Sequence, residues 1–274
     1  RHNMVVYPIV AGGVSVGSMF LAGMIPGLIM LASLMITGYL IGLKRGYGYG
    51  GPVIKKQIPG IIIHGLLSFT PAVIIVSAII SGWATATEAG AIAAVYAFVL
   101  AFLAYREAPL SNIWGVLIRT FRTVLMVFFL IAASQAFGWV MAYLHLPDII
   151  TEWFIGVSDK PWVILLMINV LLLLLGGPMD MAPMILILTP ILLPVCVKLG
   201  MDPIQFGIIM IFNSGMGLLT PPVGTVLFVG CAIGKVSVEA GTRAMLPFFY
   251  AMFVVLMAIT YIPAITMWLP KMFV

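Results

Sequence analysis

The sequence has 274 residues, of which 63% are hydrophobic and only 8% are charged. Soluble globular proteins carry about 25% charged residues, so this composition predicts an all-α polytopic membrane protein. The net charge of +5 does not indicate a nucleic-acid partner, because the basic residues are spread over short loops, where the orientation of membrane helices accounts for them. Isolated cysteines and histidines give no metal-binding pattern, and no cofactor is expected.

Apolar segments long enough for a membrane-spanning helix recur along the chain. The first covers residues 15–43 and contains Pro26. After a basic loop at 44–57, residues 60–81 are cut by prolines and glycines, and this segment is predicted to lie in the interface, to re-enter or to span. Further spans are predicted at 88–105, 123–144, 161–177 and 245–268, with shorter interfacial pieces at 111–122 and 147–157.

The segment 177–200, GPMDMAPMILILTPILLPVCVKLG, has a different pattern. Two apolar arms meet at Thr189 and Pro190. An arm of about nine residues reaches only about half of the ~30 Å bilayer core. We therefore expect a re-entrant hairpin with its tip near the membrane midplane. A single kinked span is the alternative.

The stretch GLLTPPVGTVLFVG, residues 217–230, places two adjacent prolines inside an apolar run. Prolines remove backbone donors and disfavour helix just before them. The pattern predicts one discontinuous helix within 202–234, made of two half-helices at 202–216 and 225–234. The first half presents free carbonyls at the break and the second presents free amides.

Oxygen atoms at this break suit a small hard cation, and the amides suit an anionic substrate. The candidate ion ligands are the carbonyls of Leu219, Thr220, Pro222 and Val223 and the hydroxyl of Thr225, with Thr189 adding oxygens from the hairpin tip. Asn213 and Ser214, about a turn and a half earlier, are candidate substrate-binding residues. The alternative interpretation is a proline kink that serves helix packing.

Other polar and small residues have local interpretations. Thr85-Ala86-Thr87-Glu88 matches a capping box, which we favour over a proton or cation site at Glu88. Asp180 fits a helix start, where an acidic side chain favours the helix dipole. Asn169 is expected to hydrogen-bond to a neighbouring helix, and Gly23 and Gly27 to allow close helix packing.

Two parts of the chain match each other, residues 2–27 and 224–249. Gly12 aligns with Gly234, Ser15 with Ser237 and, after one skipped residue, Pro26 with Pro247. Internal symmetry with a broken helix in each half is typical of secondary transporters. We favour inverted repeats, which require 60–81 to lie in the interface. The alignment puts Arg1 just after the missing counterpart of the paired prolines, so the sequence is expected to be a fragment.

Residues 176–229, GGPMDMAPMILILTPILLPVCVKLGMDPIQFGIIMIFNSGMGLLTPPVGTVLFV, resemble the large membrane subunit of tripartite ATP-independent periplasmic (TRAP) transporters. SGWATATEAGAIAAVYAFVLAF and VSVGSMFLAGMIPGLIM resemble further stretches of that family. The sequence departs from the family in lacking most of the first repeat, and in carrying Arg1 where the family usually has a small polar residue.

The resemblance implies an elevator-type fold and a multi-pass protein of the bacterial inner membrane. The implied function is sodium-coupled import of small organic acids, with a small membrane subunit and a periplasmic substrate-binding protein as partners. The family's sodium ligands correspond to Thr189, Thr220, Val223, Gly224 and Thr225.

These inferences divide the chain into three regions. Residues 1–43 would end the first repeat, 44–85 would hold the basic loop and the interfacial or re-entrant segment, and 86–274 would form the second repeat. Two other function classes fit the sequence less well. An intramembrane enzyme would need an acid–base pair at membrane depth, which the sequence does not provide, so no enzyme is predicted. A structural membrane subunit would not need a hairpin followed by a broken helix.

Overall fold

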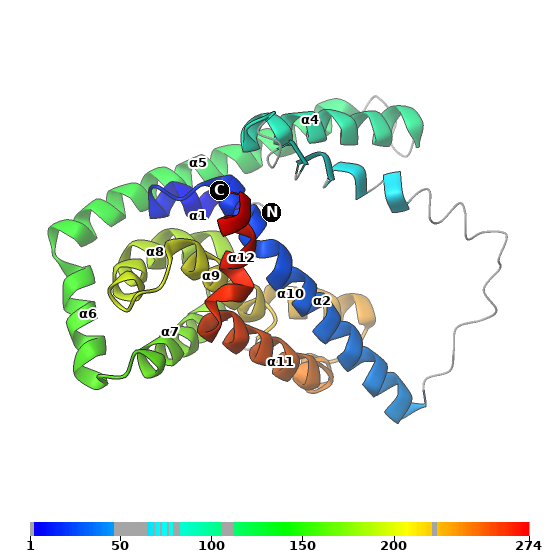
Figure 1. Cartoon of the computed structure of the whole chain (residues 1–274). Helices are drawn as coiled ribbons and strands as arrows, with labels where there is room; N and C mark the ends of the chain where they lie inside the picture. The colour runs from blue at the N-terminus through cyan, green and yellow to red at the C-terminus, as the bar shows by residue number, and fades with distance from the viewer. Residues whose placement is uncertain are drawn as a thin grey trace. The chain divides into compact units, whose positions relative to one another are not determined.

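The computed structural model describes residues 3–46, 65–67, 69–71, 73–75, 77–78, 83–105, 112–220 and 224–273. The regular elements of these residues are all helices (Figure 1), as predicted for an all-α membrane protein. The chain forms two compact units, one of Arg1–Lys44 with Phe129–Val274, the other of Arg45–Phe128. The candidate site lies in the first unit.

The helices of the first unit cover most of its length. They are α1 (Asn3–Ala11), α2 (Val16–Arg45), α6 (Leu146–Val157), α7 (Pro161–Gly176), α8 (Met181–Lys198), α9 (Pro203–Gly217), α10 (Thr225–Gly234), α11 (Val238–Tyr261) and α12 (Pro263–Phe273). The second unit contains α4 (Ala86–Val99), which continues as a π-helical turn, Leu100–Ala104. Helix α5 (Ile113–Tyr143) runs from the second unit into the first.

Among the described residues, three helices are long and apolar enough to cross a membrane: α2, α8 and α11, with 30, 18 and 24 residues. Helix α7, with 16 residues, is also apolar but shorter. Large apolar side chains such as Leu28, Met35 and Val254 are more than half exposed on α2 and α11. A bilayer or a membrane partner covers such faces in a protein of this composition.

Two predicted segments differ from the helices of the structure. Residues 113–143 form one helix, α5, which contains both the predicted interfacial lead-in up to 122 and the predicted span that follows it; no proline interrupts this stretch. The predicted span 245–268 is interrupted at Ile262, between α11 and α12. The cause is Pro263, because a proline disfavours helical backbone in the residue before it and favours the first position of a new helix.

The predicted hairpin tip at Thr189 and Pro190 is also wrong. Helix α8 is continuous from Met181 to Lys198 and includes Pro190 and Pro194. At 1.5 Å per residue its 18 residues extend about 27 Å. Its burial against α1, α6 and α9 offsets the donors that the prolines remove. The chain leaves helical geometry before α8, at residues 177–180, rather than in its middle.

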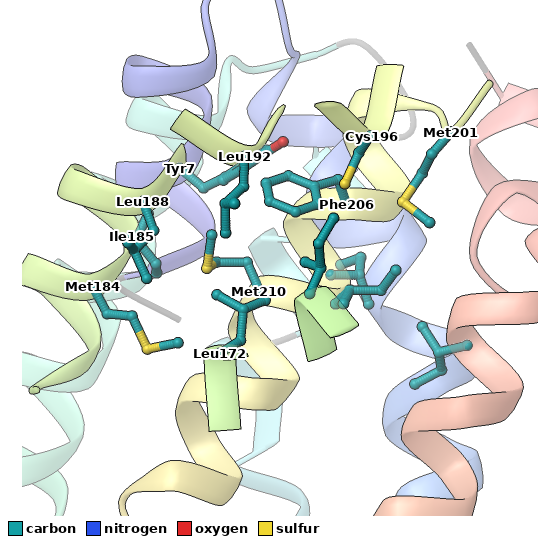
Figure 2. Close-up of a cluster of buried hydrophobic side chains, with 14 of the residues drawn as sticks. Tyr7, Leu172, Met184, Ile185, Leu188, Leu192, Cys196, Met201, Phe206 and Met210 are labelled. Carbon is teal, nitrogen blue, oxygen red and sulfur yellow. The ribbon is translucent and has the colours of Figure 1, made fainter. Parts of the chain in front are cut away.

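The core of the first unit is formed by buried side chains of α1, α7, α8, α9 and α11 (Figure 1). Figure 2 shows side chains of α1, α7, α8 and α9 gathered in this core. Tyr7 of α1 is fully buried there, and its hydroxyl donates to the carbonyl of Pro203 at 2.6 Å. Gly207 makes room for the ring, because a Cβ at that position would collide with Tyr7. Cys196 is a buried core residue.

The helix starts in the two matched sequence stretches correspond. Helix α2 begins after Ser15, whose Oγ accepts from the Ser18 N–H at 3.4 Å, and α11 begins after Ser237, whose Oγ accepts from the Ala240 N–H at 3.3 Å. Each turn also contains a positive-φ residue at the equivalent position, Gly13 in one and Lys235 in the other. The starts of α2 and α11 therefore correspond at the same offset that aligns Gly12 with Gly234.

Candidate functional site

Three helix ends converge in the first unit. The end of α7 contacts the end of α9, because a Cβ on Gly217 would lie only 2.5 Å from the Cα and the carbonyl carbon of Gly176. The first turn of α8 lies against the same part of α9, where the Ser214 Oγ is 3.3 Å from the Met184 Sδ. The residues between α7 and α8 therefore lie beside the end of α9.

Helices α7 and α9 run in the same direction. Asn169 of α7 contacts Asn213 of α9, and Gly176 and Gly217 follow these residues in each helix and contact each other. Two parallel helices that end together place the carbonyl groups of two helix ends side by side. The carboxyl end of each helix also carries about half a negative charge from the helix dipole, so this place favours a cation.

The interrupted segment begins at the same point. After Gly217 the chain forms a tight turn, in which the Leu219 N–H donates to the Met216 carbonyl at 3.0 Å and the Thr220 N–H to the Gly217 carbonyl at 2.9 Å. Helix α10 begins at Thr225. The helix ends thus agree with the two half-helices that the sequence predicts. Residues 221–223 lie outside the described residues.

Gly224, the last residue before α10, lies against the carbonyls of the turn. Its N–H donates to the Thr220 carbonyl at 3.0 Å. A Cβ on Gly224 would lie 2.9 Å from the carbonyl oxygens of both Leu218 and Thr220. Only glycine allows this approach without displacing the carbonyls. The segment therefore gathers backbone oxygens beside the joined ends of α7 and α9.

Of the ion ligands predicted at the interrupted helix, some lie among the described residues and others do not. Leu219, Thr220 and Gly224 lie in or beside the turn, and the Thr220 hydroxyl donates to the Met216 carbonyl at 2.9 Å. Pro222 and Val223 lie outside the described residues, as does the side chain of Thr225.

Thr189 does not join the other predicted ligands. It lies eight residues into α8, about 12 Å along the helix axis from Met181. Its side chain is fully buried, and its hydroxyl has no hydrogen-bond partner within the described part of the chain. Because α8 is continuous through Thr189, the geometric reason for including it, a position at a hairpin tip, is removed.

The two candidate substrate residues are both buried. The Ser214 hydroxyl donates to the Met210 carbonyl at 2.7 Å, within its own helix. The Asn213 amide donates to the Asn169 side-chain oxygen at 2.8 Å and to the Ile209 carbonyl at 3.0 Å. The predicted hydrogen bond from Asn169 to a neighbouring helix is thereby confirmed.

The acidic residues Glu88 and Asp180 have the helix-capping roles that the sequence predicts. The Glu88 carboxylate accepts from the Thr85 N–H at 2.8 Å, while the Thr85 hydroxyl oxygen accepts from the Glu88 N–H at 3.3 Å, which completes the capping box of α4. Asp180 caps α8 by accepting from the Met181 N–H at 2.9 Å. Among the described residues, no group of three or more His, Cys, Asp or Glu side chains could hold a metal ion.

Sequence reasoning missed the pair formed by Gly176 and Gly217. Gly176 and Gly177 end a run of five leucines, and Gly215 and Gly217 are two residues apart in α9. These glycines were visible in the sequence, but the spacing does not show which of them meet. Only the parallel packing of α7 on α9 identifies the pair.

Comparison with known proteins identifies a family of transporters. Residues 2–265 match the sequence model of the family described as "Tripartite ATP-independent periplasmic transporter, DctM component". The chain is 42% identical over 270 residues to the uncharacterized protein YgiK of Salmonella typhimurium. The alignment covers 98% of this chain and 62% of YgiK.

Two further relatives have descriptive names. The chain is 38% identical to the C4-dicarboxylate TRAP transporter large permease protein DctM of Pseudomonas aeruginosa, over 98% of this chain and 62% of that protein. It is 36% identical to the sialic acid TRAP transporter large permease protein SiaM of Vibrio cholerae, over 98% of this chain and 63% of that protein. The chain thus spans less than two thirds of the length of these relatives.

Proposed function

Because this chain belongs to the DctM family of tripartite ATP-independent periplasmic transporters, we propose that it is part of a subunit that imports small organic acids across the bacterial inner membrane. The family is one of transporters rather than enzymes. The apolar helices α2, α8 and α11 support a place in the membrane.

A carboxylate is the proposed common feature of the substrate. The relative from Pseudomonas aeruginosa is named for C4-dicarboxylates and the one from Vibrio cholerae for sialic acid, and both kinds of molecule carry a carboxylate. Helix α10 begins just after the interruption, at Thr225. The free amides at such a helix start can hydrogen-bond a carboxylate.

Sodium is the proposed coupling ion. The observation that carries this part of the proposal is the meeting of the ends of α7 and α9 at Gly176 and Gly217, next to the carbonyls of Leu218 and Thr220. Backbone oxygens of half-helix ends are the ligands that secondary transporters use for sodium. We therefore place the sodium site at these helix ends rather than at Thr189.

Coupling follows from the position of this site. A sodium ion bound there would hold the ends of α7 and α9 and the start of α10 in one geometry. If this geometry is the one that binds the substrate, sodium raises the substrate affinity, and the substrate raises the sodium affinity by the same factor. The matching turns before α2 and α11 support a second site of the same kind in an inverted repeat, as an elevator-type transporter would have.

The proposed partners are a small membrane subunit and a periplasmic substrate-binding protein, as the word "tripartite" in the family's description indicates. The test is reconstitution of the complete transporter in proteoliposomes with its binding protein outside. Uptake of radiolabelled C4-dicarboxylates and sialic acid is measured with an inward sodium gradient and with potassium in its place. We expect uptake of at least one carboxylate that depends on both sodium and the binding protein. Uptake that is equal in potassium would refute the sodium coupling.

A further inference from the structure

A chain of buried amide and hydroxyl groups connects α7, α9 and α11. The Asn213 amide donates to the Asn169 oxygen at 2.8 Å, and the Asn169 amide donates to the Thr260 hydroxyl oxygen at 3.2 Å. The Thr260 hydroxyl in turn donates to the Leu256 carbonyl at 2.8 Å. All three side chains are at most 2% exposed.

This chain of hydrogen bonds lies just before the joined helix ends. Asn213 is four residues before Gly217 and Asn169 is seven residues before Gly176, which corresponds to about 6 and about 10 Å along the helix axes. The Asn213 backbone carbonyl also lies 3.6 Å from the position that a Cβ on Gly176 would take. The amide pair and the glycine pair are therefore two successive contacts along the same helix interface.

An amide pair fixes this interface more closely than an apolar pair would. Apolar side chains tolerate a small axial or rotational shift, whereas a hydrogen bond weakens steeply when its length or angle changes. A single buried asparagine can set the register between helices for this reason, at a cost in stability. A shift of one residue, about 1.5 Å, would separate the Asn169–Asn213 bond and move Gly176 away from Gly217.

We propose that Asn169 and Asn213 are positioning residues, which hold the carboxyl ends of α7 and α9 in the register that the sodium site needs. This inference rests on the proposed sodium coupling. Neither side chain is assigned as a ligand. The amide pair acts through the backbone carbonyls at the helix ends, because the register of the helices decides where those carbonyls lie.

The chain offers a matched control in Gln205. This residue is also a buried amide of α9, 2% exposed, and its Nε2 donates to the carbonyls of Ile259 and Thr260 at 3.0 Å each. It thus connects α9 to α11 by two hydrogen bonds, but it lies twelve residues before Gly217, about 18 Å away along the axis. A purely structural role for buried amides predicts similar effects at Gln205 and at Asn213.

The experiment compares Asn169→Leu, Asn213→Leu and Gln205→Met in the complete reconstituted transporter. The sodium concentration for half-maximal uptake and the thermal unfolding midpoint are measured for each variant. We expect the two asparagine variants to raise the half-maximal sodium concentration about tenfold, as losing a group that orients ion ligands typically does. Gln205→Met lowers the unfolding midpoint but leaves the sodium concentration unchanged. Because both single variants remove the Asn169–Asn213 hydrogen bond, the double variant Asn169→Leu/Asn213→Leu gives a shift clearly smaller than the sum of the two single shifts.

Asn213→Gln keeps the experiment decisive if the leucine variants do not fold. The longer amide retains its polarity but cannot bond Asn169 at the same helix register, so we expect a folded protein with weaker sodium dependence. Parental sodium affinity in folded asparagine variants, or an equal loss in Gln205→Met, would overturn the proposal. If the parental transporter itself shows no sodium dependence, the proposed sodium coupling is wrong, and so is the inference that rests on it. The measurement on the parental transporter therefore separates this outcome from a failure of the positioning role alone.

Discussion

The backbone of Gly176 contacts the backbone of Gly217, and no side chain separates them. A Cβ on Gly217 would lie 2.6 Å from the Gly176 carbonyl oxygen, and a Cβ on Gly176 would lie 3.1 Å from the Gly217 Cα. Both residues end their helices, α7 and α9. The contact brings the carboxyl ends of two helices together, and the proposed sodium site depends on it.

We predict that Gly217→Ala abolishes sodium-dependent uptake. The added methyl group would collide with backbone atoms of Gly176, which cannot rotate away as a side chain can, so the ends of α7 and α9 must separate. Gly215→Ala is the matched control in the same helix, because its Cβ would meet only the Met181 methyl group at 3.9 Å. Uptake is measured in proteoliposomes at saturating substrate.

The control variant should retain uptake and gain up to about 1 kcal/mol of stability from the better helix propensity of alanine. Equal uptake in Gly217→Ala and Gly215→Ala would contradict the close contact of the helix ends.

A second prediction tests the interrupted segment by comparing substitutions at two glycines, Gly224 and Gly230. In Gly224→Ala the new Cβ would lie 2.9 Å from the carbonyl oxygens of Leu218 and Thr220, so these oxygens must move. We expect the half-maximal sodium concentration to rise by at least about tenfold, the scale of losses when ion ligands are misoriented. Gly230→Ala in α10 is the control, because a Cβ there meets no atom within 4 Å, and it should behave as the parent does. A normal sodium dependence in Gly224→Ala would mean that the prolines serve only as a packing kink.

Thr189→Val tests the corrected position of the ion site. The Thr189 hydroxyl is buried and has no partner among the residues that the structure describes, and valine has nearly the same shape. Removing an unsatisfied buried hydroxyl is neutral or stabilising, by up to about 1 kcal/mol. We expect an unchanged sodium dependence and an equal or higher unfolding midpoint. A loss of sodium affinity would restore Thr189 to the ion site.

The capping box of α4 predicts different effects for its two members. Glu88→Gln should preserve both folding and sodium-dependent uptake, because glutamine can fill the same capping position. Thr85→Ala should lower stability by about 1 kcal/mol, since it removes the N-cap oxygen. Thermal unfolding and uptake are measured on both variants. Loss of sodium dependence in a well-folded Glu88→Gln protein would show that this carboxylate has more than a capping role.

Local sequence signals predicted local structure well. The capping box at Thr85 and Glu88 and the helix start at Asp180 depend on residues that are neighbours in the chain. The ends of α9 and α10 at the paired prolines have the same kind of cause, because proline acts on the residues next to it.

The errors arose where distant parts of the chain decide the structure. Pro190 suggested a turn, but packing of α1, α6 and α9 on α8 keeps the helix continuous. The contact between Gly176 and Gly217 joins residues 41 positions apart, and no periodicity or spacing reveals such a pair. The interrupted helix could therefore be predicted from the sequence, whereas the end of α7 as the other side of the proposed site required the structure.

Equilibrium binding of radioactive sodium to the purified complete transporter tests the central claim most directly. The parent, Gly217→Ala and Thr189→Val are compared, with size-exclusion elution as the control for folding. We predict saturable binding in the parent and in Thr189→Val, and loss of a bound sodium ion in Gly217→Ala. Parental binding in Gly217→Ala, or lost binding in Thr189→Val, would contradict a sodium site at the joined ends of α7 and α9.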